Sequence, residues 1–194
     1  VDRERSLNAH VKNRFVDKEL ERRAIAVVRA VRQAVGDDVD LMVDVTAEGT
    51  PEVMTRIGRA IEEYDPFWYE EPLDPFDVDS YRALKDKVNI PIAAGERLYT
   101  RYGFRRLIEQ RAVDIVQPDA GTAGGILESW RIASMAETYG MRVAPHNCGG
   151  PVLTAAAVQL AACSSNLVCL EVFPYRPASH YGIVRHALEK EIRQ

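Results

Sequence analysis

The sequence has few cysteines and no pattern that joins them. Cys148, Cys163 and Cys169 are the three cysteines among 194 residues, and no two of them form a C-x-x-C pair. An odd number without such a pair argues against a disulfide framework and against a cysteine-motif zinc site. We therefore expect a protein of a reducing compartment, the cytoplasm.

Long apolar runs and an excess of basic residues are also missing. No apolar run approaches the ~18 residues of a membrane-spanning helix, and the opening VDRERSLNAH has no apolar signal region. The formal net charge is −4 and the pI is about 5.6, whereas nucleic-acid binders usually carry a basic surface. We expect neither a membrane nor a nucleic acid as a partner.

What the sequence does have is a regular alternation of two patterns. Short, apolar, β-favouring runs alternate with longer amphipathic stretches, which is typical of a parallel α/β sheet. The expected strands lie within 39–45, 66–72, 90–96, 113–119, 141–146 and 166–172. The expected helices lie within 17–36, 50–64, 77–88, 100–111, 123–140 and 150–164, with Thr50 as an N-cap, Pro51 at the first helical position and Gly36 as a helix stop.

One acid or imidazole recurs near the end of each expected strand. The residues are separated by 26, 26, 23, 27 and 25 positions: Asp44, Glu70, Glu96, Asp119, His146 and Glu171. In parallel α/β proteins the carboxyl ends of all strands face one edge, where the active site is built. We therefore expect these six side chains to converge.

Six strands are too few for a closed eight-stranded barrel, which typically needs about 250 residues. The alternatives are an open doubly wound sheet and part of a barrel, and we favour the second. We expect residues 1–194 to be an incomplete barrel domain of about six βα units, with 1–16 irregular, 178–194 a tail, and no N-terminal capping domain among these residues.

The first three acids suggest a cation site. Two charges at 4 Å repel by about 4 kcal/mol at an effective dielectric of 20, so Asp44, Glu70 and Glu96 together call for a compensating cation. Carboxylate oxygens suit Mg²⁺. Singly, Asp44 could be a helix N-cap, Glu70 a solvated acid and Glu96 a partner of Arg97, but the common spacing favours the metal.

The next residues suggest proton transfer. Asp119 and His146 fall on neighbouring strand ends, and a carboxylate on one imidazole nitrogen leaves the other free to move a proton. A buried histidine is more often structural, although its loop with Asn147 and two glycines favours function. Glu171 would face the same cavity. The GTAGG segment at 121–125 could cradle an anion or only allow tight helix packing.

These motifs, taken in order, resemble a known family. LMVD, WYEEP, PIAAGE, IVQPDAGTAGG and VAPHNCGGP, between about residues 20 and 177, are similar to the enolase superfamily in its mandelate racemase-like branch. GERLYTR and PHNCGGP are most similar to acid-sugar dehydratases. The resemblance implies a modified (β/α) barrel of the TIM type, usually with a capping domain, and a homo-oligomer.

The resemblance also implies roles for the residues. Mg²⁺ would be bound by Asp44, Glu70 and Glu96, the base dyad would be His146 with Asp119, and Glu171 would be the acid on the last strand. Adjacent side chains in a strand point to opposite faces, so Glu70 and Glu71 cannot both bind one ion. The resemblance selects Glu70. We expect Arg97 and Asn147 to contact the substrate.

Two features depart from the family pattern within these residues. No convincing K-x-K pair is present, since Lys12 and Lys18 lie in unpatterned sequence, and Thr46 stands where some sugar-acid dehydratases have a second histidine. The leading hypothesis is a Mg²⁺-dependent lyase that dehydrates a sugar acid to a 2-keto-3-deoxy acid. The alternatives are a racemase or epimerase using the same enolate and a non-catalytic metabolite- or partner-binding relative. A nucleotide-binding domain is disfavoured because no G-x-G-x-x-G follows an early strand.

Overall fold

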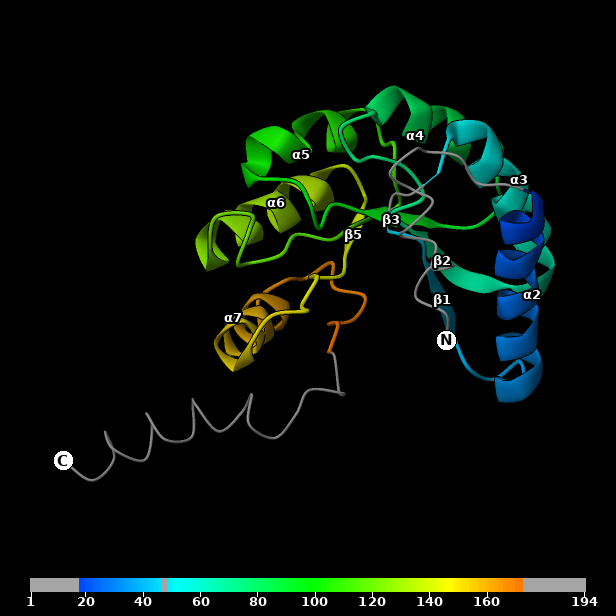
Figure 1. The fold of residues 1–194 in the computed structure, drawn as a ribbon. Helices are drawn as coiled ribbons and strands as arrows, with labels where there is room; N and C mark the ends of the chain where they lie inside the picture. The colour runs from blue at the N-terminus through cyan, green and yellow to red at the C-terminus, as the bar shows by residue number, and fades with distance from the viewer. Residues whose placement is uncertain (1–17, 47–48, 173–194) are drawn as a thin grey trace. The chain divides into compact units, whose positions relative to one another are not determined.

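Helices and strands alternate along the chain in the computed structural model, which describes residues 18–46 and 49–172 (Figure 1). The five strands form a parallel sheet in the order β1-β2-β3-β4-β5. A doubly wound sheet reverses its strand order at a switch point, whereas a (β/α) barrel keeps each strand beside the next. The order is that of part of a barrel, which confirms the predicted fold class. The predictions for 1–16 and 178–194 lie outside the described residues.

Contacts divide the chain into two compact units, one within Val1–Ala94 and Glu109–Ile115, the other within Gly95–Ile108 and Val116–Gln194. Each unit is described by itself. Along the described residues no helix is long and apolar enough to cross a membrane.

The first unit contains three of the strands and the helices that precede and separate them. Its elements are α2 (Lys18–Val35), β1 (Leu41–Asp44), α3 (Pro51–Ile61), the 3₁₀ helix η2 (Glu62–Tyr64), β2 (Pro66–Glu70), α4 (Val78–Lys85) and β3 (Ile92–Ala94). The predicted helix signals are confirmed: Thr50 caps α3, Pro51 begins it, and α2 ends before Gly36, whose φ is 77°.

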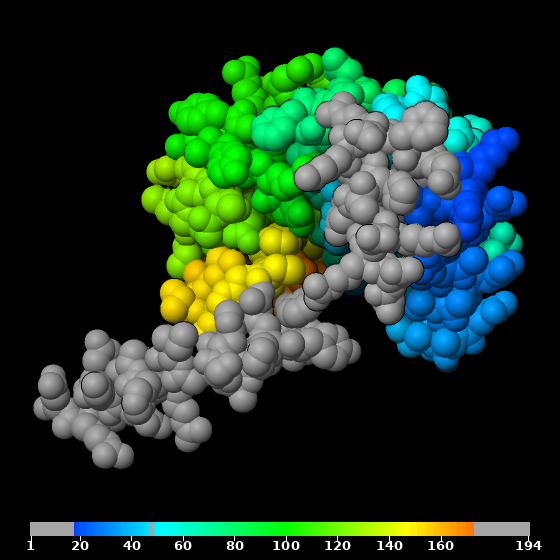
Figure 2. All heavy atoms as spheres, viewed as in Figure 1, coloured from blue at the N-terminus to red at the C-terminus, as the bar shows by residue number. Residues whose placement is uncertain are grey.

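Helix α2 makes side-chain hydrogen bonds to the rest of its unit. Among its residues only Val28 is buried, and the blue side chains of α2 are visible over much of their length in Figure 2. Arg56 on α3 makes two hydrogen bonds to Glu21, of 3.0 and 2.8 Å. Arg32 donates to the carbonyl oxygens of Tyr64 and Asp65, so one guanidinium joins α2 to the turn before β2.

The register of the first unit's strands places two acids side by side. Asp44 is the partner of Glu70 across β1 and β2, and Glu70 is the partner of Ala93 on β3. The ladder continues past the strand ends, because Val45 donates to the Glu70 carbonyl and Glu71 to the Ala93 carbonyl. The backbone therefore holds the ends of these strands in a fixed register.

The second unit continues the same alternation. It contains α5 (Thr100–Glu109) up to Ile108, the second residue of β4 (Ile115–Val116), α6 (Ile126–Thr138), β5 (Arg142–Val143) and α7 (Pro151–Ala162). The Ala144 N–H donates to the Val116 carbonyl, which ties the end of β5 to β4.

The sixth expected strand is reduced to a single bridge. Within 166–172 only Leu167 pairs with β5, as an isolated parallel bridge to Val143. The carbonyl of Glu171 accepts a hydrogen bond from the Asn147 side chain. A side-chain amide therefore takes a backbone acceptor that a longer ladder would use.

Candidate active site

Two acids end neighbouring strands in the first unit. Asp44 is the last residue of β1 and Glu70 the last of β2, and the two are register partners. Side chains at directly paired positions lie on the same face of a sheet. Glu70 is only 8% exposed, whereas Asp44 is exposed. Two ionised carboxylates at paired positions on one face repel one another. This donor set of carboxylate oxygens fits a hard divalent cation.

Each of these carboxylates is oriented by a nearby donor. The indole N–H of Trp68 donates to Oε2 of Glu70 at 2.8 Å, and the backbone N–H of Thr46 donates to Oδ1 of Asp44 at 2.9 Å. Thr46 has a φ of 50°, a conformation that is costly for a β-branched residue and that is more frequent at functional sites. Trp68 was not among the predicted site residues, although strand alternation places it on the same face as Glu70.

Glu71 differs from Glu70 in burial and backbone. It follows the last residue of β2, has a φ of 41°, and its side chain is fully buried. The chain therefore leaves the strand conformation between the two glutamates. The expectation that their side chains serve different purposes is consistent with this change.

The second unit begins at a glycine that a larger residue could not replace. Gly95 has a φ of 132°, and a Cβ there would lie 2.5 Å from Cε1 of the buried Phe104. Glu96 follows it, and its Oε2 lies 3.2 Å from Nε2 of His146. This glycine turn thus places the third predicted metal ligand beside the predicted base.

Asp119 is fixed by the loop that follows it. It is 6% exposed, and its Oδ1 accepts the N–H groups of Gly121 and Thr122 at 2.6 and 3.2 Å. The Ala123 N–H donates to the Asp119 carbonyl. Three of the amides that could have cradled an anion, those of Gly121, Thr122 and Ala123, thus donate to Asp119 itself. Gly125 is the N-cap of α6, with a φ of 89°.

His146 is bound to Asp119 as the sequence predicted. Its Nδ1 lies 2.6 Å from Oδ2 of Asp119, while Nε2 lies 3.2 Å from Glu96 and 3.9 Å from Glu171. One ring nitrogen therefore faces the orienting carboxylate and the other faces two further acids.

The acids around this imidazole change its protonation. Burial lowers the pKa of His146, but the hydrogen bond to Asp119 and the charges of Glu171 and Glu96 outweigh burial and raise the pKa to about 9. Burial raises the pKa of Asp119, but the hydrogen bonds from His146 and the Gly121 N–H outweigh it and hold the pKa below its usual value. Asp119 is therefore ionised and can only accept, so Nδ1 carries a proton.

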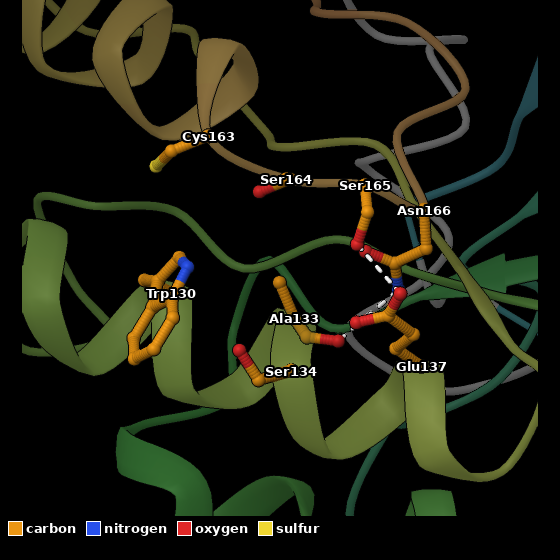
Figure 3. A pocket seen from close by; sticks show the side chains of 8 residues that line it. All are labelled: Trp130, Ala133, Ser134, Glu137, Cys163, Ser164, Ser165 and Asn166. Carbon is orange, nitrogen blue, oxygen red and sulfur yellow. Dashed lines mark hydrogen bonds between the residues drawn. The ribbon is translucent and has the colours of Figure 1, made fainter.

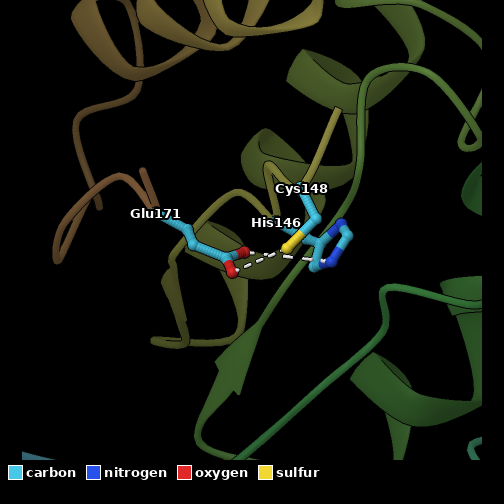
Figure 4. A group of neighbouring side chains, drawn as sticks. All are labelled: His146, Cys148 and Glu171. Atoms are coloured by element: carbon cyan, nitrogen blue, oxygen red, sulfur yellow. Dashed lines mark hydrogen bonds and ion pairs between the residues drawn. The ribbon is translucent and has the colours of Figure 1, made fainter. Parts of the chain in front are cut away.

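Glu171 accepts hydrogen bonds at both carboxylate oxygens. Its Oε2 accepts the Asn147 N–H at 2.9 Å, and its Oε1 accepts the Cys148 thiol at 3.1 Å (Figure 4). Asn147 is 2% exposed and donates its side-chain amide to Thr154 and to the Glu171 carbonyl. These contacts of Asn147 are internal, so substrate binding by Asn147 stays a prediction. Substrate binding by Arg97, which is exposed, also stays a prediction.

A separate small hollow of about 110 Å³ lies between α6 and the segment after α7 (Figure 3). Ser165 donates to Glu137 at 2.6 Å and Asn166 to the Ala133 carbonyl at 3.1 Å. Cys163 and Trp130 also line it, and none of the predicted site residues does.

The profile of the family described as enolase C-terminal domain-like matches residues 4–192. The chain belongs to this family. A solved structure of an enolase superfamily member from Salmonella Typhimurium superposes with a TM-score of 0.80 at 39% identity, covering 82% of this chain and 41% of that one. The resemblance to the enolase superfamily is thereby confirmed.

Named relatives of this family member are sugar-acid dehydratases. The D-xylonate dehydratase of Haloferax volcanii is 36% identical over 169 residues, which is 87% of this chain and 40% of that protein. The D-gluconate dehydratase of Thermoproteus tenax is 38% identical over 161 residues, or 83% and 32%. The chain thus spans less than half the length of these relatives.

Proposed function

We propose that the protein is a Mg²⁺-dependent hydro-lyase that removes the proton α to the carboxylate of a sugar acid and dehydrates the acid to a 2-keto-3-deoxy acid. The observation that carries the proposal is the 2.6 Å contact between His146 Nδ1 and Asp119. The relatives named as D-xylonate and D-gluconate dehydratases support the reaction and the substrate class.

His146 is proposed as the general base. Asp119 accepts the Nδ1 proton and fixes the ring, so Nε2 is the nitrogen that can exchange a proton with the substrate. In its neutral form Nε2 would take the α-proton, and the resulting N–H would then be returned to the departing β-hydroxyl. The Cα–H and Cβ–O bonds break, water leaves, and the enol product becomes the 2-keto acid.

Asp44, Glu70 and Glu96 are proposed to hold the Mg²⁺ ion. The paired positions of the first two and the burial of Glu70 fit a cation, and the ordered spacing of all three supports the set. When bound, Mg²⁺ supplies positive charge that stabilises the enolate and offsets the carboxylate charge that Glu96 presents to His146. Glu171, held by Asn147 and Cys148, is proposed to face the substrate.

Three further assignments complete the proposal. Arg97 and Asn147 would bind the substrate near Glu96 and His146. The protein would act as a homo-oligomer. The cytoplasm is the proposed location, because the sequence has three cysteines without a C-x-x-C pair.

A racemase or epimerase acting through the same enolate is the second candidate. The same base and metal ligands would serve it, since a scaffold does not fix the reaction. A non-catalytic relative is the third candidate. The hydrogen bond between His146 and Asp119 disfavours it, because binding alone does not require an oriented base.

Proton exchange separates the three candidates. The full-length protein is incubated in heavy water with Mg²⁺ and a library of sugar acids. Keto-acid product supports dehydration, whereas deuterium at Cα with inversion supports epimerisation. Mg²⁺ binding without exchange on any acid would support a binding protein. His146→Asn should abolish exchange, and full activity in this variant would refute His146 as the base.

A further inference from the structure

We propose that His146, Cys148 and Glu171 form a second cation site that takes Zn²⁺ and that blocks His146 when it is filled. The ligand atoms of the three residues all lie within 4.8 Å of one another (Figure 4). They come from the loop after β5 and from the segment after α7, in the same unit.

The donor atoms lie close to the spacing of the ligands of a tetrahedral ion, within 4.8 Å of one another. Bond lengths of about 2.0–2.3 Å to nitrogen, oxygen and sulfur put tetrahedral ligands roughly 3.3–3.8 Å apart. Cys148 Sγ lies 3.1 Å from Glu171 Oε1, and His146 Nε2 lies 3.9 Å from Glu171 Oε2. Binding of all three to one ion would require the side chains to rotate until the donor atoms reach this spacing, and it would leave a fourth position for water.

The imidazole is already oriented for such an ion. Asp119 accepts from Nδ1 at 2.6 Å, so Nε2 is the nitrogen that can act as a ligand. Metal-binding histidines commonly donate their other ring nitrogen to a carboxylate in this way. The same arrangement that makes His146 a base therefore makes it a metal ligand.

The thiol determines which ion is taken. A soft thiolate ligand disfavours Mg²⁺. A site that contains one therefore prefers Zn²⁺ more strongly than a site of oxygen ligands alone does. Cys148 is exposed, so an ion can reach it from solvent. It loses its thiol proton to the solvent on binding, because the ligand is the thiolate. The sequence disfavoured a zinc site because it has no C-x-x-C pair. Glu171 is 23 residues from Cys148, so a search for short metal-binding motifs does not detect this cluster.

Zinc at this site would stop proton transfer. The Nε2 lone pair would be bound to the ion, so it could not accept the α-proton. This consequence rests on the proposed function, whereas zinc binding does not.

The test measures binding first and activity second. The full-length protein is freed of metal and titrated with Zn²⁺ against a chelating dye, and with Co²⁺ in an absorption spectrometer. We expect one high-affinity Zn²⁺ per chain and a thiolate-to-cobalt charge-transfer band. Cys148→Ser should weaken Zn²⁺ binding at least about tenfold and remove the band. The matched control Cys163→Ser, an exposed cysteine outside the cluster, should keep both.

Unchanged Zn²⁺ affinity in Cys148→Ser, or a band that is lost in Cys163→Ser instead, would overturn the site. In the activity arm, Zn²⁺ should inhibit α-proton exchange at saturating Mg²⁺, and a chelator should restore it. Exchange that continues with zinc bound would overturn the block. Zinc binding in a protein that exchanges no acid would instead refute the proposed function and leave the site standing.

Discussion

The indole of Trp68 donates to the carboxylate of Glu70 across 2.8 Å, two residues apart on one face of β2. Both side chains are buried, at 4% and 8% exposure. A buried carboxylate is stabilised by each donor that it accepts from, and hydrogen-bonded ligands hold metals better. Trp68 therefore positions Glu70 for the proposed Mg²⁺.

Trp68→Phe should lower Mg²⁺ affinity by about 10–100-fold, because Phe fills most of the space and removes only the donor. Calorimetric titration of the folded variant measures this. Trp130→Phe is the matched control, since Trp130 is 42% exposed on α6, and it should bind Mg²⁺ like the wild type. Equal affinity in both variants would mean that Trp68 has no part in metal binding.

The two adjacent glutamates should respond differently to the same substitution. Glu70→Gln removes a proposed ligand, so Mg²⁺ binding should fall further than in Trp68→Phe. Glu71→Gln should keep Mg²⁺ affinity and lower the free energy of unfolding by about 1–3 kcal/mol, because Glu71 is fully buried and Gln cannot accept with both terminal atoms. Calorimetry and urea unfolding measure the two effects. If Glu71→Gln lost Mg²⁺ binding and Glu70→Gln kept it, Glu71 and not Glu70 would be the metal ligand.

The spacing of the sequence was sufficient to predict both pairs of neighbouring groups. Asp44 with Glu70 and Asp119 with His146 are 26 and 27 residues apart, which is one βα unit, and parallel neighbours keep strand ends together. The structure pairs the first two in register and the second two by a hydrogen bond.

Side-chain competition for backbone groups was not predictable in the same way. The N–H groups of Gly121 and Thr122 donate to the Asp119 carboxylate and are not available to a bound anion. The Asn147 side chain donates to the carbonyl of Glu171, where a strand was expected. Hydropathy patterns report which residues are buried but not which polar group satisfies which. The approach of Cys148 to Glu171 was missed for the same reason.

The raised pKa of His146 predicts how stability depends on pH in the metal-free protein. The folded pKa is about 9 against an ordinary value of 6.5. The native state therefore holds a proton that the unfolded state releases between these values. The stabilisation is fully present below pH 6.5 and is lost as pH rises through 9.

Urea unfolding from pH 6 to 10 measures this loss, and His146→Gln should remove that part of the pH dependence. Asp119→Asn should lower the pKa of the imidazole, observed by NMR of the ring, because the strongest stabilising hydrogen bond to the charged ring is lost. A ring that still titrates near 9 in Asp119→Asn would contradict the assigned cause.

Gly95 and Gly103 test whether the turn before Glu96 needs a glycine. A Cβ at Gly95 would meet Cε1 of Phe104 at 2.5 Å and the Gln117 backbone nitrogen at 3.3 Å, at a φ of 132°. Gly95→Ala should lower the free energy of unfolding by about 3 kcal/mol or more, from overpacking and backbone strain together. It should also weaken Mg²⁺ binding, because Glu96 follows directly.

Gly103 is the matched control because it lies at an exposed position of α5 and its Cβ would meet only Leu98 Cβ, at 3.8 Å. Gly103→Ala should raise the free energy of unfolding by about 0.5–1 kcal/mol, since alanine favours the helix. Urea unfolding measures both variants. If Gly95→Ala were as stable as Gly103→Ala, the turn would tolerate a side chain. Gly95 would then not be the reason for the position of Glu96.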